Sequence, residues 1–341
     1  LHLLSRRQRQ MCIRDSAGVV MTYLNIGLGS LIPVIYTPIM LRILGQAEYG
    51  LYSLANSVVG YLSLLTFGLG STIVRYVAKY RAEGDKEGEE KVIGLFIVMY
   101  CFLALLVLVG GAAISCNVEP IFHRGLSEAE INKISILVLI MAFNTAISFP
   151  ISVFGSIIMA HEKYIYRQAV NILSTVAVPC ANIVVLYMGF GSIGLSIVST
   201  GLQFLMLPLN AGYCFKVLKI KPRFKHLPIT LIKELVGFSV FVFIGSIVDM
   251  LFWATDKVIL GMLTSTSVVA VYNIGVTFNT MMTNISTAFS GVLTPKITVM
   301  VSKSAQPEQL TELFIRVGRL QYLIIALALS GFIVFGRDFI F

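Results

Sequence analysis

Charged residues are scarce in this sequence. Of its 341 residues, 13% are charged and 57% are hydrophobic, whereas soluble domains carry about 25% charged residues. Apolar runs of about 20 residues recur along the whole chain, and each is long enough to cross a bilayer core of about 30 Å. The shortage of charge therefore excludes an ordinary soluble domain and predicts a polytopic membrane protein.

Residues suited to metal, redox or catalytic centres are few and scattered. The five cysteines form no CxxC pair and lie mostly in or beside apolar runs, where small packing residues are expected. A membrane enzyme would need acids or histidines clustered at one membrane face. The longest loop expected outside the cytoplasm has no compelling arrangement of its candidates, Glu119, His123, Glu128 and Glu130. We therefore predict no catalytic residue, cofactor or metal.

The apolar runs are continuous, which favours helices over strands. Only helices or closed barrels satisfy backbone hydrogen bonds in lipid, and barrel strands show a short alternating pattern that these runs lack. We predict an all-α polytopic membrane fold. The nine expected spans are 18–41, 49–71, 92–115, 134–158, 169–188, 192–216, 235–257, 267–294 and 312–335.

Positive charge is concentrated in alternate loops. Cytoplasmic loops of membrane proteins carry an excess of Lys and Arg, so the richer loops and the native N-terminus are predicted to face the cytoplasm. The richer set has seventeen such residues, Arg75, Lys79, Arg81, Lys86, Lys91, Lys163, Arg167, Lys216, Lys219, Lys221, Arg223, Lys225, Lys233, Lys296, Lys303, Arg316 and Arg319. The opposite set has five, Arg42, Arg124, Lys133, Lys257 and Arg337.

The first sixteen residues, "LHLLSRRQRQMCIRDS", resemble the translation of an adapter used in sequencing libraries. We expect residues 1–16 not to be native, and without them the net charge falls from +9 to +6. They also lack the apolar region and cleavage site of a signal peptide. Since topology explains the remaining positive charge, no nucleic-acid partner is predicted.

An internal repeat organises the chain. The stretch "YTPIMLRILGQAEYGLYSL" aligns with "FWATDKVILGMLTSTSVVAVYNI": each has I-L-G, a short polar link, a tyrosine and a new apolar span. We predict a first six-helix lobe at 17–217, a basic cytoplasmic connector at 218–233 and a partial second lobe at 234–341. Six spans return the chain to the same side, so the copies are parallel repeats. About three helices follow the connector, so we expect a C-terminally truncated second lobe.

Three stretches carry a family resemblance: "GSLIPVIYTPIMLRILGQAEYGLYSL", "FGLGSTIVRYVAKYR" and "DKVILG…VAVYNIG". On these, the chain from about Ala17 onward resembles the Wzx-like oligosaccharide flippases of the multidrug/oligosaccharidyl-lipid/polysaccharide (MOP, MATE-like) exporter superfamily. The resemblance implies two six-helix lobes, alternating access and transport of a polyprenyl-diphosphate-linked oligosaccharide for cell-surface polysaccharide. It also implies a bacterial or archaeal plasma membrane, with a polysaccharide polymerase and glycosyltransferases as partners.

Two alternatives stay open. A multidrug or cation antiporter of the same superfamily would favour acids and aromatics in its cavity over Arg and Lys. A membrane-embedded enzyme of polysaccharide assembly is less favoured, because the clustered acids or histidines that it needs are missing. For a transporter, H⁺ or Na⁺ is an open choice of coupling ion.

Ionisable residues within the seventh span are the first candidates for a transport pathway. Asp249 lies about eleven residues past Phe238, or about 16 Å along a helix, and residues at such depth normally face a bundle interior or a water-filled cavity. Asp256 follows seven residues later on the same face, and Lys257 lies broadly on that side. Asp256 and Lys257 fit the rim of a pathway and the wet end of a helix equally well.

Cations elsewhere are candidates for binding the diphosphate. Arg42 precedes Gly45 by three residues, much as Lys257 precedes Gly261 by four. A cation at the mouth of each lobe would suit an anionic diphosphate, and an interfacial anchor explains Arg42 equally well. Arg75, at the cytoplasmic end of the second span, is a further candidate that the positive-inside bias also explains.

Proline and asparagine complete the candidate set. Pro33 interrupts the first span, and broken helices near the midplane often line transport pathways. The repeat places Pro33 opposite Asp249, which favours a cavity position over a tolerated kink. Asn25 and Asn279 are candidates for binding sugar hydroxyls, although hydrogen bonds between helices are the favoured interpretation.

Overall fold

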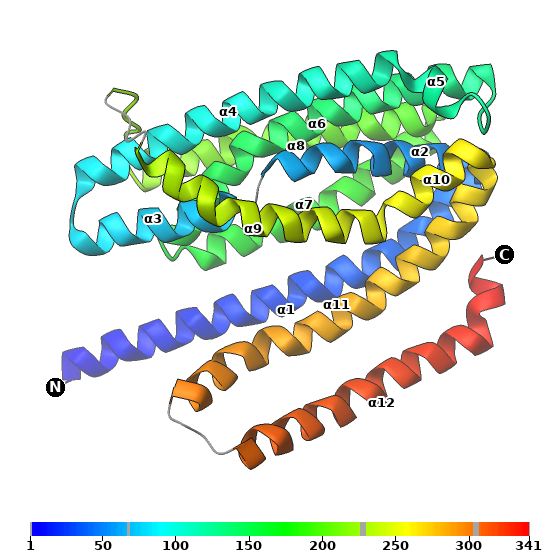
Figure 1. Ribbon diagram of the computed structural model, residues 1–341. Helices are drawn as coiled ribbons and strands as arrows, with labels where there is room; N and C mark the ends of the chain where they lie inside the picture. The colour runs from blue at the N-terminus through cyan, green and yellow to red at the C-terminus, as the bar shows by residue number, and fades with distance from the viewer. Residues whose placement is uncertain (1, 67–68, 226–229, 303–306, 341) are drawn as a thin grey trace.

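The computed structural model describes residues 2–66, 69–225, 230–302 and 307–340, and these ranges contain helices and no strand. The predicted all-α fold is confirmed (Figure 1). The helices are α1 (His2–Leu44), α2 (Gln46–Gly60), the 3-10 helix η1 (Tyr61–Thr66), α3 (Leu69–Glu83), α4 (Lys86–Cys116), α5 (Val118–Phe122), α6 (Glu128–Ala160), α7 (Tyr164–Tyr187), α8 (Gly191–Gly212), the π-helical turn η2 (Tyr213–Val217), α9 (Thr230–Trp253), α10 (Thr255–Leu263), α11 (Thr266–Ser302) and α12 (Pro307–Ile340).

Each of the nine predicted spans overlaps one of these helices or helical runs. Within the described residues, seven stretches are long and apolar enough to cross a membrane, and Val242–Trp253 is a shorter apolar helix. The seven are Val20–Leu44, Gln46–Glu83, Lys86–Cys116, Glu128–Ala160, Tyr164–Tyr187, Gly191–Val217 and Glu308–Gly331. The chain is therefore a multi-pass membrane protein.

Several helices begin before the apolar stretch that predicted them, because polar residues cap their first turns. At α4 the Asp85 carboxylate accepts a hydrogen bond from the backbone N–H of Gly88 at 2.9 Å. At α6, Ser127 and Glu130 form a capping box. Such caps satisfy backbone N–H groups that have no partner within the helix. These helices therefore extend beyond the lipid-facing apolar segment.

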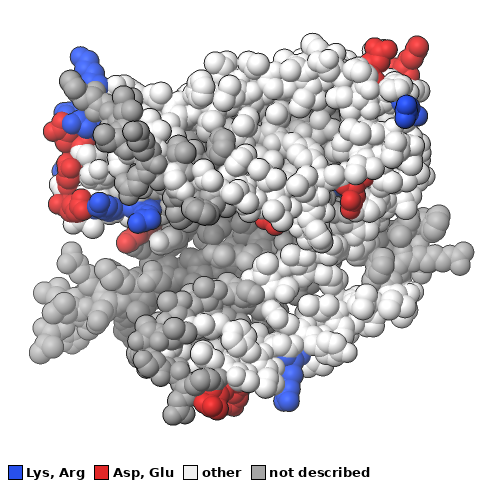
Figure 2. Space-filling view, in the orientation of Figure 1, with Lys and Arg blue, Asp and Glu red and all other residues white. Residues whose placement is uncertain are grey.

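The connections between helices gather at two ends of the bundle (Figure 1). The C-terminal ends of α3, α6, α8 and α11 and the N-terminal ends of α4, α7, α9 and α12 lie at one end, called the basic end below. The C-terminal ends of α1, α4, α7 and α10 and the N-terminal ends of α2, α6, α8 and α11 lie at the other. Charged side chains in Figure 2 gather mainly at the edges of the molecule, and most of the surface between them is uncharged. The loops predicted to share a membrane side thus share an end of the structure.

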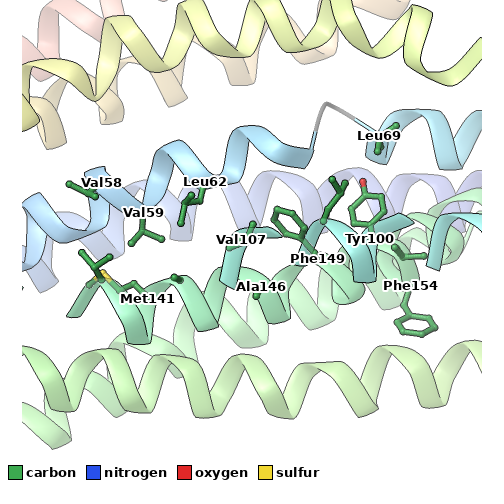
Figure 3. Packing of buried hydrophobic residues seen from close by; sticks show 14 of the residues in the cluster. Val58, Val59, Leu62, Leu69, Tyr100, Val107, Met141, Ala146, Phe149 and Phe154 are labelled. Atoms are coloured by element: carbon green, nitrogen blue, oxygen red, sulfur yellow. The ribbon is translucent and has the colours of Figure 1, made fainter. Parts of the chain in front are cut away.

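The interior and the exterior of the first six spans are both apolar. Figure 3 shows the buried cluster, in which the Tyr100 and Phe149 rings meet edge to face with centroids 6.1 Å apart. On the outer side of the same helix α4, Phe102, Leu105 and Val109 are more than half exposed. A helix that is apolar all round suits a protein interior on one side and lipid on the other. The first six spans therefore combine an apolar interior with a lipid-facing surface.

The predicted single span 235–257 is wrong. Helix α9 ends at Trp253, and α10 begins at Thr255 after Ala254. The second span is also interrupted, by the 3-10 helix η1. The two interruptions meet, because the Tyr61 hydroxyl lies 2.7 Å from the Thr255 hydroxyl. The break places Asp256 and Lys257 in the first turn of a separate short helix.

The connector is held against the first lobe at the basic end. The Arg223 guanidinium lies 3.0 Å from Glu87 and 3.5 Å from Glu90, and the Arg223 backbone N–H donates to the Glu90 carbonyl at 3.0 Å. Helix α9 begins at Thr230, so the end of the predicted connector 218–233 is helical. The connector therefore docks on α4, and the lobe boundaries proposed from the sequence stay a prediction.

Helices α2 and α11 pack closely together away from the basic end. A β-carbon on Gly50 would collide with the backbone carbonyl of Thr266, so the two backbones approach each other where α2 has no side chain. Hydrogen bonds surround this contact: the Thr266 hydroxyl donates to Glu130 at 2.7 Å, and the Gln46 amide donates to the Ser267 carbonyl at 3.2 Å. The α2–α11 contact therefore joins the two parts of the chain.

Substitution Gly50→Ala tests this contact. We expect it to lower the free energy of unfolding by about 1–3 kcal/mol, because the added methyl group forces α2 and α11 apart. Thermal unfolding in detergent provides the measurement. Gly275→Ala is the matched control, since a β-carbon on Gly275 meets nothing within 4 Å and alanine favours helix by up to about 1 kcal/mol. Equal stability of the two variants would contradict the close contact.

Candidate functional site

A central cavity of about 580 Å³ lies between α1, α2, α9, α10 and α11. Helices on both sides of the predicted connector therefore contribute to it, and its volume falls in the range of about 300–1,000 Å³ typical of ligand pockets. The residues that line it are Tyr36, Thr37, Met40, Tyr49, Tyr52, Ser53, Asn56, Ser57, Gly60, Met250, Trp253, Ala254, Lys257, Asn273, Val276, Thr280 and Thr283.

The lining carries many polar groups but almost no charge. Hydroxyl and amide groups predominate among its polar side chains, and Trp253, the one tryptophan of the sequence, adds an aromatic surface. Among the described residues that line the cavity, Lys257 is the one that carries a charge. The cavity therefore offers a single cation on a neutral surface of mixed polar and apolar groups.

Neutral groups hold Lys257. Its Nζ donates to the Asn273 side-chain oxygen at 3.1 Å, and the Asn273 amide donates to the Tyr49 hydroxyl at 2.7 Å. This chain of hydrogen bonds links α10, α11 and α2. No carboxylate of the described residues lies within 4.0 Å of the ammonium group. Lys257 is therefore a cation at the cavity that hydrogen bonds to neutral groups.

Asp256 and Lys257 do not pair with each other. Asp256 is exposed and accepts a hydrogen bond from the Tyr272 hydroxyl, whereas Lys257 points to the cavity. Successive residues on a helix do not face each other. Of these two candidates, the structure thus brings Lys257 to the cavity and leaves Asp256 outside its lining.

Asp249 is exposed on α9, one residue before Met250, which lines the cavity. Its carboxylate is not part of the described lining. The sequence indicates how deep a residue lies in a uniformly apolar helix but not how that helix is rotated about its axis. The cavity role proposed for Asp249 therefore gains no support from its position and stays a prediction.

Arg42, Arg75 and Pro33 lie outside the central cavity. Arg42 is exposed in the last turn of α1, and Arg75 is exposed on α3. Pro33 borders a small gap where α1 packs against Ile274 and Phe278 of α11. None of the three is among the described lining residues.

The two predicted asparagines lie in different surroundings. The Asn25 amide donates to Gln168 at 3.3 Å, and its oxygen accepts from the Thr175 hydroxyl at 3.3 Å, so Asn25 joins α1 to α7. Asn279 is exposed on α11, and its backbone carbonyl accepts from the Thr283 hydroxyl at 2.9 Å. Neither side chain is part of the described cavity lining.

The sequence interpretation missed the neutral residues of the cavity. On α2, Tyr49, Ser53, Asn56 and Gly60 recur every three or four residues and all line the cavity. That spacing marks one face of a helix, so a search for neutral polar stripes would have found it. Asn273 carries no comparable signal, because single asparagines in membrane helices often bond to neighbouring helices.

The described part of the chain offers no ligand set of the kind that holds a metal ion. Among the described residues, no group of three or more His, Cys, Asp or Glu side chains is placed to hold a metal ion. The chemistry available in the cavity is therefore hydrogen bonding and the charge of Lys257.

Comparison with known proteins identifies a family match. The model of the polysaccharide biosynthesis protein family matches residues 16–301. An uncharacterised membrane protein of Bacillus subtilis (strain 168), EpsK, is 24% identical over 140 residues, which are 40% of this chain and 27% of EpsK. The match thus spans about a quarter of the length of this curated relative.

Two solved structures share the fold. One is an inward-facing multidrug resistance MATE family transporter of the MOP superfamily, with a TM-score of 0.65 and 17% identity over 92% of this chain and 70% of that one. The other is a MOP superfamily transporter from Pyrococcus furiosus, with a TM-score of 0.61 and 15% identity over 94% of this chain and 72% of that one. The latter is described as having a binding pocket of reverse polarity that suggests a different function.

Substitution Asn273→Ala tests the hydrogen bonds that hold Lys257. We expect the free energy of unfolding to fall by about 1–3 kcal/mol, because Lys257 and Tyr49 both lose a partner. Asn279→Ala, about two turns further along α11, is the matched control and should change stability little, because its side chain is exposed. Stability is measured by thermal unfolding in detergent. If the two variants are equally stable, the hydrogen bonds of Asn273 contribute nothing to the stability of the protein.

Proposed function

Since the chain belongs to the polysaccharide biosynthesis protein family, we propose that it transports an oligosaccharide linked to a polyprenyl diphosphate across the membrane. The family match and the MATE-like fold support a multi-pass membrane protein of transporter type. The observation that carries the finer proposal is the unpaired ammonium group of Lys257 in the central cavity.

The charge of the cavity favours an anionic cargo over a cationic one. A diphosphate can bind the Lys257 ammonium group by charge-assisted hydrogen bonds, and neutral hydroxyl and amide groups can bind sugars. A multidrug or cation antiporter would need acids in the cavity, and the described lining contains none. We therefore propose the flippase as the function and the antiporter as the alternative that the experiment below must exclude.

The position of the cavity suits alternating access between the two repeats. Away from the basic end, α2 and α11 are joined at Gly50 and through the Asn273–Tyr49 hydrogen bond. An anion that binds the Lys257 ammonium group would lie beside Asn273, which hydrogen bonds to both Lys257 of α10 and Tyr49 of α2. We propose that cargo binding shifts this chain of hydrogen bonds, loosens the α2–α11 contact and favours opening at that end, while the lipid tail stays in the bilayer.

We place the protein in the plasma membrane of a bacterium or archaeon, with its basic end in the cytoplasm, because cytoplasmic loops are rich in Lys and Arg. Glycosyltransferases that assemble the cargo and a polymerase that consumes it are the proposed partners. Coupling to H⁺ or Na⁺ is also a proposal, with Asp249 as the candidate residue.

Substitution Lys257→Gln tests the proposed function. In cells that depend on this protein for surface polysaccharide, we expect export to fall at least tenfold, because the diphosphate loses its cation. Lys257→Arg should retain part of the export, since it keeps the charge but changes the geometry. Surface polysaccharide is measured against the membrane abundance of each variant.

Arg124→Gln is the matched control, because Arg124 is an exposed cation outside the cavity, and its export should be unchanged. A cation exporter would behave differently, because Lys257 would repel its cationic cargo. Loss of Lys257 would then leave drug resistance unchanged or raise it. Normal polysaccharide export by Lys257→Gln would refute the proposed role of the cavity.

Cysteine labelling tests the orientation. In a variant without the native cysteines, we expect Arg124→Cys to react in intact cells with a maleimide that cannot cross the membrane. Lys221→Cys, exposed on the connector at the basic end, should react only after lysis. The reverse pattern would place the basic end outside the cell.

A further inference from the structure

A second, smaller pocket of about 150 Å³ lies within the first six spans, between α2, α6 and α8. It shares Tyr52 and Asn56 of α2 with the central cavity. The two spaces therefore adjoin at these side chains, and we call the smaller one the side pocket.

Neutral hydrogen-bonding groups dominate the side pocket. Its polar residues include Asn144 on α6 and Ser199 and Thr200 on α8, and none of the described residues that line it is charged. The Asn144 amide donates to the Thr200 hydroxyl at 3.2 Å, and Ser199 exchanges hydrogen bonds with Asn182 at 3.2 Å. These contacts join side chains of α6, α7 and α8.

Some polar groups of the side pocket can form further hydrogen bonds with a ligand. Each amide and hydroxyl group can both donate and accept, and the contacts above use only part of the capacity of Asn144. Asn56 is exposed and forms no side-chain hydrogen bond within the described part of the chain. Polar groups within a membrane protein are costly without partners. The pocket is therefore suited to a hydrated or hydroxyl-rich group.

The chemistry of the lining selects among ligands. An anion would find no cation, and a hard cation such as Ca²⁺ or Mg²⁺ typically binds carboxylates, which the described lining does not contain. A neutral polyhydroxylated group matches paired donors and acceptors on two faces of a pocket. A sugar is such a group.

We propose that the side pocket binds a sugar unit of the cargo close to the diphosphate, while Lys257 binds the diphosphate in the central cavity. This inference rests on the proposed function and adds to it a separate site for the neutral part of the substrate. Asn144 and Ser199 bind the sugar hydroxyls, and Asn56 lies at the junction of the two sites. The side pocket thus distinguishes a glycosylated lipid from the bare lipid diphosphate.

Binding of two soluble probes to the purified protein tests this inference. The probes are farnesyl diphosphate and the same molecule carrying one N-acetylglucosamine, and their Kd values are compared by calorimetry. Wild-type protein should bind the sugar-bearing probe at least fivefold more tightly. Asn144→Leu should remove most of this gain and leave the Kd for farnesyl diphosphate within twofold, because losing one or two hydrogen bonds costs roughly three- to tenfold in affinity.

Ser148→Ala is the matched control. Ser148 lies one turn further along α6, donates to the Thr145 backbone carbonyl at 2.6 Å and lies outside both pockets. It should keep the full gain from the sugar. If Asn144→Leu does not fold, Ser199→Ala removes a single hydroxyl of the same pocket and is expected to reduce the gain in the same direction.

Three outcomes would overturn the inference. Equal wild-type affinity for the two probes, or an unchanged sugar gain in Asn144→Leu and Ser199→Ala, would leave the proposed function intact and exclude a sugar site here. A Na⁺ dependence of binding that Asn144→Leu abolishes without changing the sugar gain would identify a cation site instead. If wild-type protein binds neither probe, the proposed function fails and this inference fails with it.

Discussion

The structure depends on one constraint: a polar group inside a bilayer must find its partner within the protein. The lipid-facing side chains of α4 are apolar and need no hydrogen-bond partner. In the centre of the molecule, polar side chains instead form hydrogen bonds between helices. Tyr61 and Thr255 meet where two spans are interrupted. Asn273 satisfies Lys257 and Tyr49 together. The polar residues that line the cavity are therefore also those that hold its walls in place.

The apolar core and the contact between the two parts of the chain are built from different interactions. Helices α2, α3, α4 and α6 supply most of a continuous apolar core that includes Tyr100 and Phe149, and interiors of this kind resist deformation. The two parts of the chain meet chiefly through α2 and α11. There the backbones approach at Gly50, hydrogen bonds cross the contact, and apolar residues of both parts, such as Tyr49 and Ala270, are buried together.

The sequence was sufficient for the fold but not for the site. Length and continuity of the apolar runs predicted the helices, and the distribution of Lys and Arg predicted which loops share an end, because both properties are local. Rotation about a helix axis is not local, so Asp249 was expected in the cavity lining and is exposed. The break at Ala254 was also missed, because a contact with the distant Tyr61 accompanies it. Tyr49 and Asn56 were overlooked because charge, rather than neutral polarity, guided the search.

The contact at Gly50 has a consequence for leakage. A seal made of side chains has to rearrange its rotamers whenever it opens, and imperfect closure leaves gaps along which water and protons pass. At Gly50 the backbone of α2 lies directly against the Thr266 carbonyl of α11. In the proposed transport cycle, closure at this contact would need no rotamer change at Gly50 and would leave little space through which water and protons could pass.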